Sequence, residues 1–179
     1  MGLLGYCPIC DGYDHAQQQV ALLVKDSHCL RKVKYISKLC PRLTLIPTHS
    51  LRWSPALEKW SKENGVRLAQ RPLEKISARG KPKKLFVYLK DLKKPKVFDF
   101  GYVVMGTRFD TSSTALLRGL KRVRGGFIQT SAHQETSIPG LFAVGDCVNA
   151  LAQVSVAIGQ AALAATRIHH HLVFQHAEP

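Results

Sequence analysis

Residues 19–47 read QVALLVKDSHCLRKVKYISKLCPRLTLIP, and the order of apolar and polar residues in this stretch specifies an architecture. The apolar run over residues 19–24 predicts a buried strand. The Asp-Ser pair at 26–27 is of the type that caps helices, so a helix is expected from there to about Leu39. A second apolar strand is expected over residues 43–46. Strand, helix and strand within about 30 residues form a βαβ unit, which implies a parallel sheet.

The next segment adds one helix and several strands. Ser54 before Pro55 is a helix start, because serine caps a helix and proline fits its first position. Gly65 is expected to end that helix. Residues 66–105 predict short strands joined by turns, and the apolar stretch 102–105 is the last of these strands.

The pattern changes near residue 110. We expect a short helix capped within residues 111–113 and reaching Leu120, and then two short strands over 127–130 and 141–144. A long helix over 154–173 follows, and its first half, VSVAIGQAALAA, is almost entirely small or apolar. A helix that is apolar on most sides predicts cover from several neighbours. The whole pattern predicts an α/β fold.

The composition is that of a packed globular protein, with 45% hydrophobic and 21% charged residues. No apolar run approaches the roughly 20 residues that cross a membrane. The N-terminal segment lacks the basic flank and long apolar stretch of a secretory leader. Five cysteines at irregular spacing do not match a secreted disulfide scaffold, so a cytoplasmic location is expected.

The net charge is +14, from 26 lysines and arginines against 12 acidic residues. Part of this excess is clustered in one stretch: Lys81, Lys83, Lys84, Lys90, Lys93, Lys94 and Lys96. A solvated β-hairpin is the favoured interpretation, because basic charge alone specifies no partner. The charge is compatible with an acidic partner. Nucleic acid is not expected, because the sequence has no zinc finger, RNP motif or aromatic-basic interleaving.

Three motifs occur in order along the chain. YCPICDG over residues 6–12 contains a CxxC pair, and the βαβ unit follows it. TSIPGLFAVGD over 136–146 precedes AQVS at 152–155 and GQAA at 159–162. With these motifs in this order, the chain resembles the bacterial thioredoxin reductase family over essentially its whole length. The resemblance is greatest to the reductase-like branch whose redox motif reads CPxCDG.

The resemblance implies a division of the chain into three parts. Residues 1–12 would be a redox CxxC segment, residues 13–107 a βαβ domain of the nicotinamide-binding type, and residues 108–179 the C-terminal half of an FAD-binding domain. The family's first flavin half, with the GxGxxG loop that holds the ADP end of FAD, has no counterpart in this sequence. The FAD site that the resemblance implies is therefore partial.

Catalytic roles for three residues follow from the resemblance. Cys7 and Cys10 would form the disulfide that takes electrons from reduced flavin and passes them to a protein or small-molecule disulfide. Exchange requires that one of them becomes a thiolate. Asp11 would be the acid that protonates a leaving thiolate. Half of a zinc site is the competing interpretation of the cysteines, but no second CxxC or paired histidine stands at zinc spacing, so no metal is expected.

Four further residues would contact FAD. Gly145 and Asp146 would meet its ribityl hydroxyls, and Gln153 and Val154 would present the start of the long helix to the flavin ring. Helix N-termini carry partial positive charge, which suits the negative charge that reduction builds there. The competing interpretation of Gly145-Asp146 is a tight turn without a ligand.

The nucleotide loop departs from the family pattern. By register, Val24 and Asp26 occupy the first two glycine positions, and no glycine lies elsewhere in the βαβ unit. Valine is branched where the turn must be tight, and aspartate places a negative charge where phosphate should bind. His49 and Arg52 are weak candidates for contacts to the 2′-phosphate of NADPH. NADPH binding is therefore doubtful.

The function that the sequence predicts is that of a thioredoxin-reductase-like disulfide oxidoreductase, in which electrons pass from NADPH to FAD, to the CxxC pair and to a disulfide substrate. The enzyme would be complete only if another polypeptide supplies the missing flavin half; a homo-oligomer is a second arrangement that would cover the apolar helix. Two alternatives stay open: a non-catalytic remnant or binding module without cofactors, and a thiol redox module that works without flavin.

Overall fold

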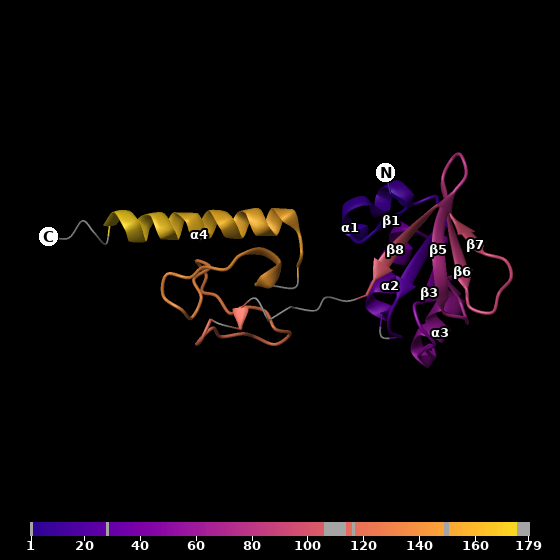
Figure 1. Ribbon diagram of the computed structural model, residues 1–179, viewed down its shortest axis with the longest axis horizontal. Helices are drawn as coiled ribbons and strands as arrows, with labels where there is room; N and C mark the ends of the chain where they lie inside the picture. The colour runs from indigo at the N-terminus through magenta and orange to yellow at the C-terminus, as the bar shows by residue number, and fades with distance from the viewer. Residues whose placement is uncertain (1, 28, 106–113, 116, 149–150, 175–179) are drawn as a thin grey trace. The chain divides into compact units, whose positions relative to one another are not determined.

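A computed structural model shows two compact units, Met1–Gly106 and Thr107–Pro179 (Figure 1). It describes residues 2–27, 29–105, 114–115, 117–148 and 151–174. Unit 1 contains the CxxC segment and the βαβ unit together, and unit 2 contains the long C-terminal helix.

Unit 1 is built on sheet A, a five-stranded parallel sheet. Its strand order is β1 (Leu4–Gly5), β8 (Phe100–Val104), β2 (Val20–Val24), β3 (Leu43–Pro47) and β4 (Arg67–Leu68). The predicted α/β fold with a parallel sheet is thus confirmed. The first strand of the chain pairs with the last strand of the unit, so the CxxC segment that follows β1 starts from the sheet.

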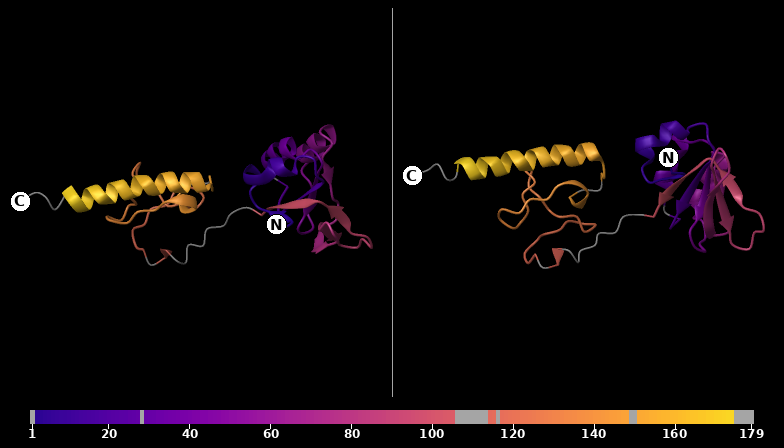
Figure 2. Two further views of the ribbon diagram at one scale, coloured as in Figure 1. Left: turned by 90° about the horizontal axis from the view of Figure 1, so that it is seen from above. Right: turned by 45° about the horizontal axis from the view of Figure 1, so that its top comes forward.

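Sheet B is antiparallel and lies against one face of sheet A. It consists of β5 (Leu73–Arg79), β6 (Lys84–Leu89) and β7 (Lys96–Phe98). Two helices, α2 (Leu30–Leu39) and α3 (Pro55–Glu63), pack on the opposite face. The unit therefore has three layers, helices, parallel sheet and antiparallel sheet, as Figure 1 and Figure 2 show.

The alternation of side chains along β2 divides the core in two. Val20, Leu22 and Val24 belong to the cluster beneath the helices, and Ala21 and Leu23 to the cluster beneath sheet B. All five are buried, because both faces of the strand are covered. Full burial of such a side chain contributes about 1.5–3 kcal/mol. The continuous apolar run in the sequence is the direct signature of this position.

The start of α2 differs from the prediction. Cys29, not the Asp-Ser pair, occupies the cap position, and its side chain makes no capping hydrogen bond to the described backbone. Residues 25–27 instead continue from β2 as a connection, and the Ser27 carbonyl accepts a hydrogen bond from the Ser54 hydroxyl at 3.3 Å. A tertiary contact has replaced the local cap.

The predicted start of α3 is confirmed. The Ser54 hydroxyl oxygen accepts a hydrogen bond from the Leu57 amide at 3.4 Å, and Pro55 is the first helical residue. The helix ends at Glu63, and Gly65 has a φ of 68°, the left-handed conformation that favours glycine after a helix. Ser54 also donates to Ser27, so a single hydroxyl ties the start of α3 to the connection after β2.

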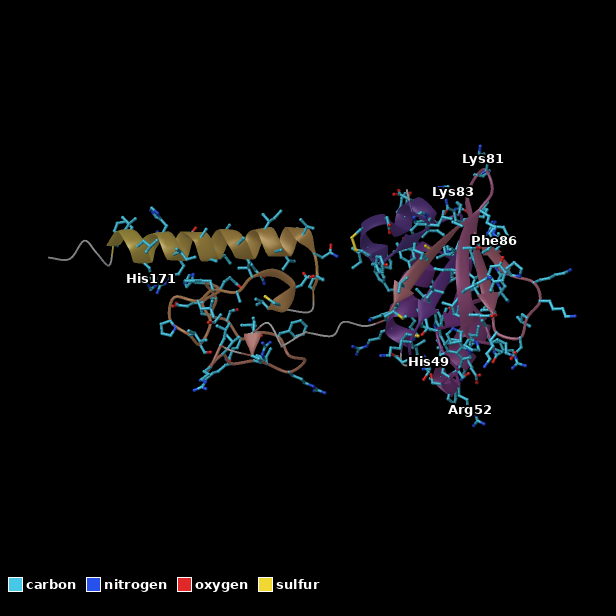
Figure 3. All side chains as sticks on the ribbon, in the orientation of Figure 1. His49, Arg52, Lys81, Lys83, Phe86 and His171 are labelled. Atoms are coloured by element: carbon cyan, nitrogen blue, oxygen red, sulfur yellow. A yellow bond between two sulfur atoms is a disulfide. The ribbon has the colours of Figure 1, made fainter. Side chains whose placement is uncertain are left out.

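The lysine cluster lies on sheet B and its connections. Lys81 and Lys83, labelled in Figure 3, stand in the turn between β5 and β6, and three more lysines stand in the connection between β6 and β7. All five are exposed. Lys84 on β6 is half-buried and pairs with Asp99. The solvated hairpin expected for this stretch is what the structure contains.

The described part of unit 2 consists of turns, a short 3-10 turn and a long helix, α4 (Val154–Phe174), which was predicted. The prediction of two strands, over 127–130 and 141–144, is wrong. Each reduces to an isolated bridge, Arg122 with Ile128 and Glu135 with Phe142. Both segments make further backbone hydrogen bonds, for example from Ile128 to Cys147 and from Leu141 to Ile138, but these go to turns rather than to one neighbouring strand, so no ladder forms in the described part of the unit.

The short helix predicted over residues 111–120 falls partly outside the described residues, as does its expected cap at 111–113. Its described part, residues 114–115 and 117–120, contains no α-helix. Among the described residues, no helix is long and apolar enough to cross a membrane.

The double role of Ser54 makes it the position to test. Ser54→Ala is expected to lower the free energy of unfolding by about 1–2 kcal/mol, because Leu57 loses its capping acceptor and Ser27 its donor. Urea denaturation followed by circular dichroism measures the change. Ser37→Ala is the matched control, since that exposed hydroxyl only donates to the Lys34 carbonyl within α2, and it should cost less than about 0.5 kcal/mol. Equal losses in the two variants would contradict the capping role.

Candidate functional site

Cys7 and Cys10 form a disulfide at the start of α1 (Pro8–Asp11). The Cys10 amide donates to the Cys7 carbonyl at 2.9 Å, which closes the turn around the bridge. Cys7 is half-buried and Cys10 is exposed, so an incoming thiolate can reach the bridge. A disulfide in such a tight, accessible turn is suited to exchange with another thiol.

Asp11 is held from within the protein. Its carboxylate oxygen Oδ1 accepts a hydrogen bond of 2.5 Å from the hydroxyl of Tyr102 on β8. Tyr102 is completely buried, and this burial, together with Asp11, raises the pKa of its hydroxyl. The phenol therefore stays protonated and donates its hydrogen bond at any pH near neutrality.

Gly12 completes the anchoring of the turn. Its carbonyl accepts a hydrogen bond from the Cys40 thiol at 3.5 Å. A Cβ added at Gly12 would lie 2.9 Å from Cδ1 of Leu39, so a larger residue would force that side chain to shift. Burial and the nearby Asp11 charge raise the pKa of Cys40, which keeps that thiol neutral. Two residues of the motif thus attach the turn to the rest of unit 1: Gly12 contacts the end of α2, and Asp11 is bound to β8.

The connection after β2 is where a nucleotide-binding protein of this type holds phosphate, and here it contains a carboxylate. Val24 is buried at the end of β2, and Asp26 is exposed two residues later. Burial and then the Asp26 charge raise the pKa of Cys29, at the start of α2, to about 11. A branched core residue and a carboxylate thus stand at the two positions where the dinucleotide-binding pattern has glycine. His49 and Arg52, both exposed after β3, are labelled in Figure 3.

In unit 2, Gly145 and Asp146 begin a short 3-10 turn, η3 (Gly145–Cys147). Gly145 has a φ of 77°, which only glycine adopts without strain, and its amide donates to Oε1 of Gln160 at 2.6 Å. Gln160 lies on α4, so the turn is fixed to the helix. Asp146 is exposed and available as an acceptor of hydrogen bonds from ligand hydroxyls.

Gln153 and Val154 lie at the start of α4, as predicted. Val154 is the first helical residue and is 77% exposed. The Gln153 amide donates to the Leu151 carbonyl at 3.0 Å, and its carbonyl accepts from Ala157. The amides of the first helical turn have no partner inside the helix and carry its partial positive charge. They are the groups that a flavin edge would meet.

The structure adds two residues that sequence reasoning missed. Tyr102 was assigned only to an apolar strand, and nothing in its local sequence signals a partner 91 positions away. Gln160 belongs to the GQAA segment of the resemblance, and a long polar side chain in the almost entirely apolar first half of the helix was the signal that could have identified it. The described residues contain no cluster of metal-ligating side chains.

Residues 20–161 match the family model described as pyridine nucleotide-disulphide oxidoreductase. The chain belongs to this family. It is 26% identical over 177 residues to thioredoxin reductase from Aquifex aeolicus (strain VF5), covering 94% of this chain and 54% of that protein.

Solved structures agree with this assignment. HlmI matches with a TM-score of 0.81 and 25% identity, over 96% of this chain and 52% of its own. Thioredoxin reductase from Streptococcus pyogenes MGAS5005 matches with a TM-score of 0.74 and 26% identity, over 95% and 57%. The chain is thioredoxin-reductase-like, and it spans about half the length of the relatives it matches.

The raised pKa of Cys29 makes stability depend on pH. The thiol ionises near 9.0 when unfolded and near 11 when folded, so its stabilising contribution is complete below pH 9 and is lost as the pH rises toward 11. The free energy of unfolding should fall over this interval, by on the order of 2 kcal/mol from this group.

Denaturation at several pH values measures this loss. Cys29→Ala should make the decline between pH 9 and 11 shallower. Asp26→Asn should make it smaller and end it at a lower pH, because the second cause of the raised folded-state pKa is removed. An unchanged profile in both variants would contradict the assignment.

Proposed function

We propose that this chain is the redox-active half of a thioredoxin-reductase-like disulfide oxidoreductase, and that Cys7 and Cys10 transfer electrons to a disulfide substrate. The observation that carries the proposal is the accessible Cys7–Cys10 disulfide beside an Asp11 that is anchored to the sheet. Family membership supports the reductase over a cofactor-free remnant or a flavin-independent thiol module. The division into a CxxC segment, a nicotinamide-type domain and a partial flavin lobe is part of this proposal.

The exchange consists of two displacements. In the reduced protein, one cysteine thiolate attacks a sulfur of the substrate disulfide, a mixed disulfide forms, and the other substrate sulfur leaves with the electron pair. The second cysteine then attacks the mixed disulfide. This restores the Cys7–Cys10 bond and releases the substrate as a dithiol. Two electrons pass from the cysteine pair to the substrate, and the released thiolates take up two protons.

Asp11 is the proposed acid of the cycle. It adjoins Cys10 in sequence, and its hydrogen bond to Tyr102 fixes its carboxyl group to the sheet beneath the turn. When the pair is reduced, the sulfur that leaves the disulfide carries negative charge, and a carboxylic acid held nearby can protonate it.

FAD would be held in part by unit 2. Asp146 would accept hydrogen bonds from the ribityl hydroxyls, and the start of α4 at Gln153 and Val154 would present amides to the flavin edge. Bound flavin would supply the two electrons that reduce the cysteine pair. The Gly145 turn, fixed by Gln160, keeps the Asp146 backbone in one conformation, which is what such a contact needs.

The surface of α4 supports the proposal that another polypeptide supplies the first flavin half. All residues of α4 are described, and Ala164 alone is buried within the unit. Large apolar side chains stay exposed along its length: Val154, Ile158, Leu163, Ile168, Leu172, Val173 and Phe174. An apolar surface of this kind marks an interface in a soluble protein. A second copy of this chain is the alternative occupant, which the net charge of +14 opposes.

The thiol chemistry can be tested on the isolated chain. Dithiothreitol should raise the number of titratable thiols under denaturing conditions from the three of Cys29, Cys40 and Cys147 to all five. The reduced protein, freed of dithiothreitol, should then reduce oxidised glutathione and return to three. Cys7→Ser and Cys10→Ser should each abolish the turnover, whereas Cys147→Ser should leave it unchanged. A pair that resists reduction, or that does not transfer its electrons, rules out the proposed function.

NADPH binding is proposed to be weak, and the cause can be tested in the connection after β2. Val24→Gly with Asp26→Gly should raise the affinity by roughly tenfold or more, because the branched side chain and the negative charge are both removed. Calorimetric titration measures the affinity, and circular dichroism confirms folding, since Val24 is a core residue.

Two single variants complete this test. Asp26→Asn leaves the core intact and should give part of the gain. Lys25→Gly loosens the same connection without removing either obstacle and should give none. Tight binding of NADPH by the unaltered chain would show that the assigned register of the loop is wrong.

A further inference from the structure

Tyr102 is an unusual side chain for the middle of a parallel sheet. It lies on β8 among aliphatic residues, is completely buried, and is one of the largest fully buried side chains of unit 1. Its ring packs edge-on against Phe100, with ring centroids 5.1 Å apart. Packing alone would be served by phenylalanine, so the hydroxyl needs its own explanation. Burying a hydroxyl lowers the stability of the fold unless the hydroxyl makes a hydrogen bond. The hydroxyl of Tyr102 makes one, to Asp11.

The hydrogen bond directs the Asp11 carboxylate toward the sheet. The negative charge of Asp11 affects two buried groups. Together with burial, it raises the pKa of the Tyr102 hydroxyl and of the Cys40 thiol. Asp14 and His15 of η1 (Gly12–His15) lie near the pair. Lys83, Lys84 and Asp99 line the same pocket as Asp11. Asp14 adds to the raised pKa of Tyr102, and the His15 ring stacks on Phe100 and meets Tyr102 edge-on.

Two contacts connect the region of α1 to the rest of unit 1. No residue of α1 is fully buried, and Pro8 and Asp11 are half-buried. The Asp11–Tyr102 hydrogen bond links α1 to the central strands, while Gly12, just after the helix, is held at Cys40. The orientation of the aspartate that follows Cys10 is therefore set by a residue 91 positions away.

We propose that Tyr102 is a positioning residue for the CxxC pair: by binding Asp11 it fixes that carboxylate and offsets part of its charge, and so sets the thiolate fraction of the reduced cysteines. The inference rests on the proposed function, because it concerns the reactivity of the same two cysteines. It assigns a role in that reactivity to a residue outside the CxxC motif.

The physical basis is the effect of a negative charge on a neighbouring thiol. A carboxylate that approaches a thiolate disfavours it and raises the thiol pKa. A hydrogen bond from a buried donor offsets part of the negative charge of a carboxylate and limits its movement, so the bound Asp11 disfavours the thiolate less than a free carboxylate would. Loss of the Tyr102 hydroxyl frees Asp11, whereas loss of the Asp11 charge removes the source of the effect. The two substitutions therefore act in opposite directions.

The experiment measures the alkylation of Cys7 and Cys10 by iodoacetamide in the reduced full chain, as a function of pH, with peptide-resolved mass spectrometry to separate them from the other cysteines. Tyr102→Phe should lower the rate at pH 7 about threefold and move the midpoint of the profile to higher pH, as expected for a shift of about half a pKa unit. Asp11→Asn should raise the rate about threefold and move the midpoint down. In the Asp11→Asn background, Tyr102→Phe should have no further effect.

Controls separate the outcomes. Tyr35→Phe removes an exposed hydroxyl on α2 and should leave the profile unchanged. Urea denaturation shows whether Tyr102→Phe stays folded under the assay conditions. Rate changes of the same sign in Tyr102→Phe and Asp11→Asn would indicate a general loosening of the turn and would overturn the proposal, as would no change in either.

Failure of the proposed function looks different. If the cysteine pair is alkylated with the predicted opposite shifts but does not transfer electrons to oxidised glutathione, the positioning role stands and the reductase assignment fails. If the pair transfers electrons and the shifts are absent, the reductase assignment stands and the role of Tyr102 falls.

Discussion

The parallel pairing of β2 with β3 and β8 is the constraint on which unit 1 depends. Val20 to Val24 are hydrogen-bonded on both sides and covered on both faces, so no residue of this strand is accessible. Helices α2 and α3 exist as packed elements because this sheet offers them an apolar face, and sheet B covers the other. The pairing also sets the position of the functional groups: it places Tyr102 of β8 beneath the CxxC turn and Val24 at the edge where a nucleotide would bind.

The proposed electron path begins at the nucleotide and ends at the cysteine pair. The residues that the chain presents differ between these two sites. The thiol end is well built, with a disulfide in a turn that is anchored at Asp11 and at Gly12. The nucleotide end carries a branched core residue and a carboxylate at the positions where the dinucleotide-binding pattern has glycine. The proposal of weak NADPH binding rests on these two residues.

Unit 2 shows the same incompleteness in its packing. Predicted strands 127–130 and 141–144 form single bridges, and α4 leaves most of its apolar surface uncovered within the unit. Both features have one cause. An extended segment needs a neighbouring strand for its backbone hydrogen bonds, and an apolar helix needs neighbours that cover its surface. The chain spans about half the length of the relatives it matches, and a segment that supplies those neighbours is what the proposed flavin-half partner would provide.

The sequence by itself determined the elements whose signals are local. Continuous apolar runs identified β2 and β3, the Ser-Pro pair identified the start of α3, and the CxxC and GD motifs identified the candidate sites, because spacing along the chain fixes what these residues can do. The tertiary structure decided what depends on residues distant in sequence. Cys29 took the cap position while Ser27 bonded to Ser54, Gln160 fixed the Gly145 turn, and Tyr102 bound Asp11 across 91 positions. A polar group takes whichever partner the folded chain brings within reach, and no local pattern encodes that choice.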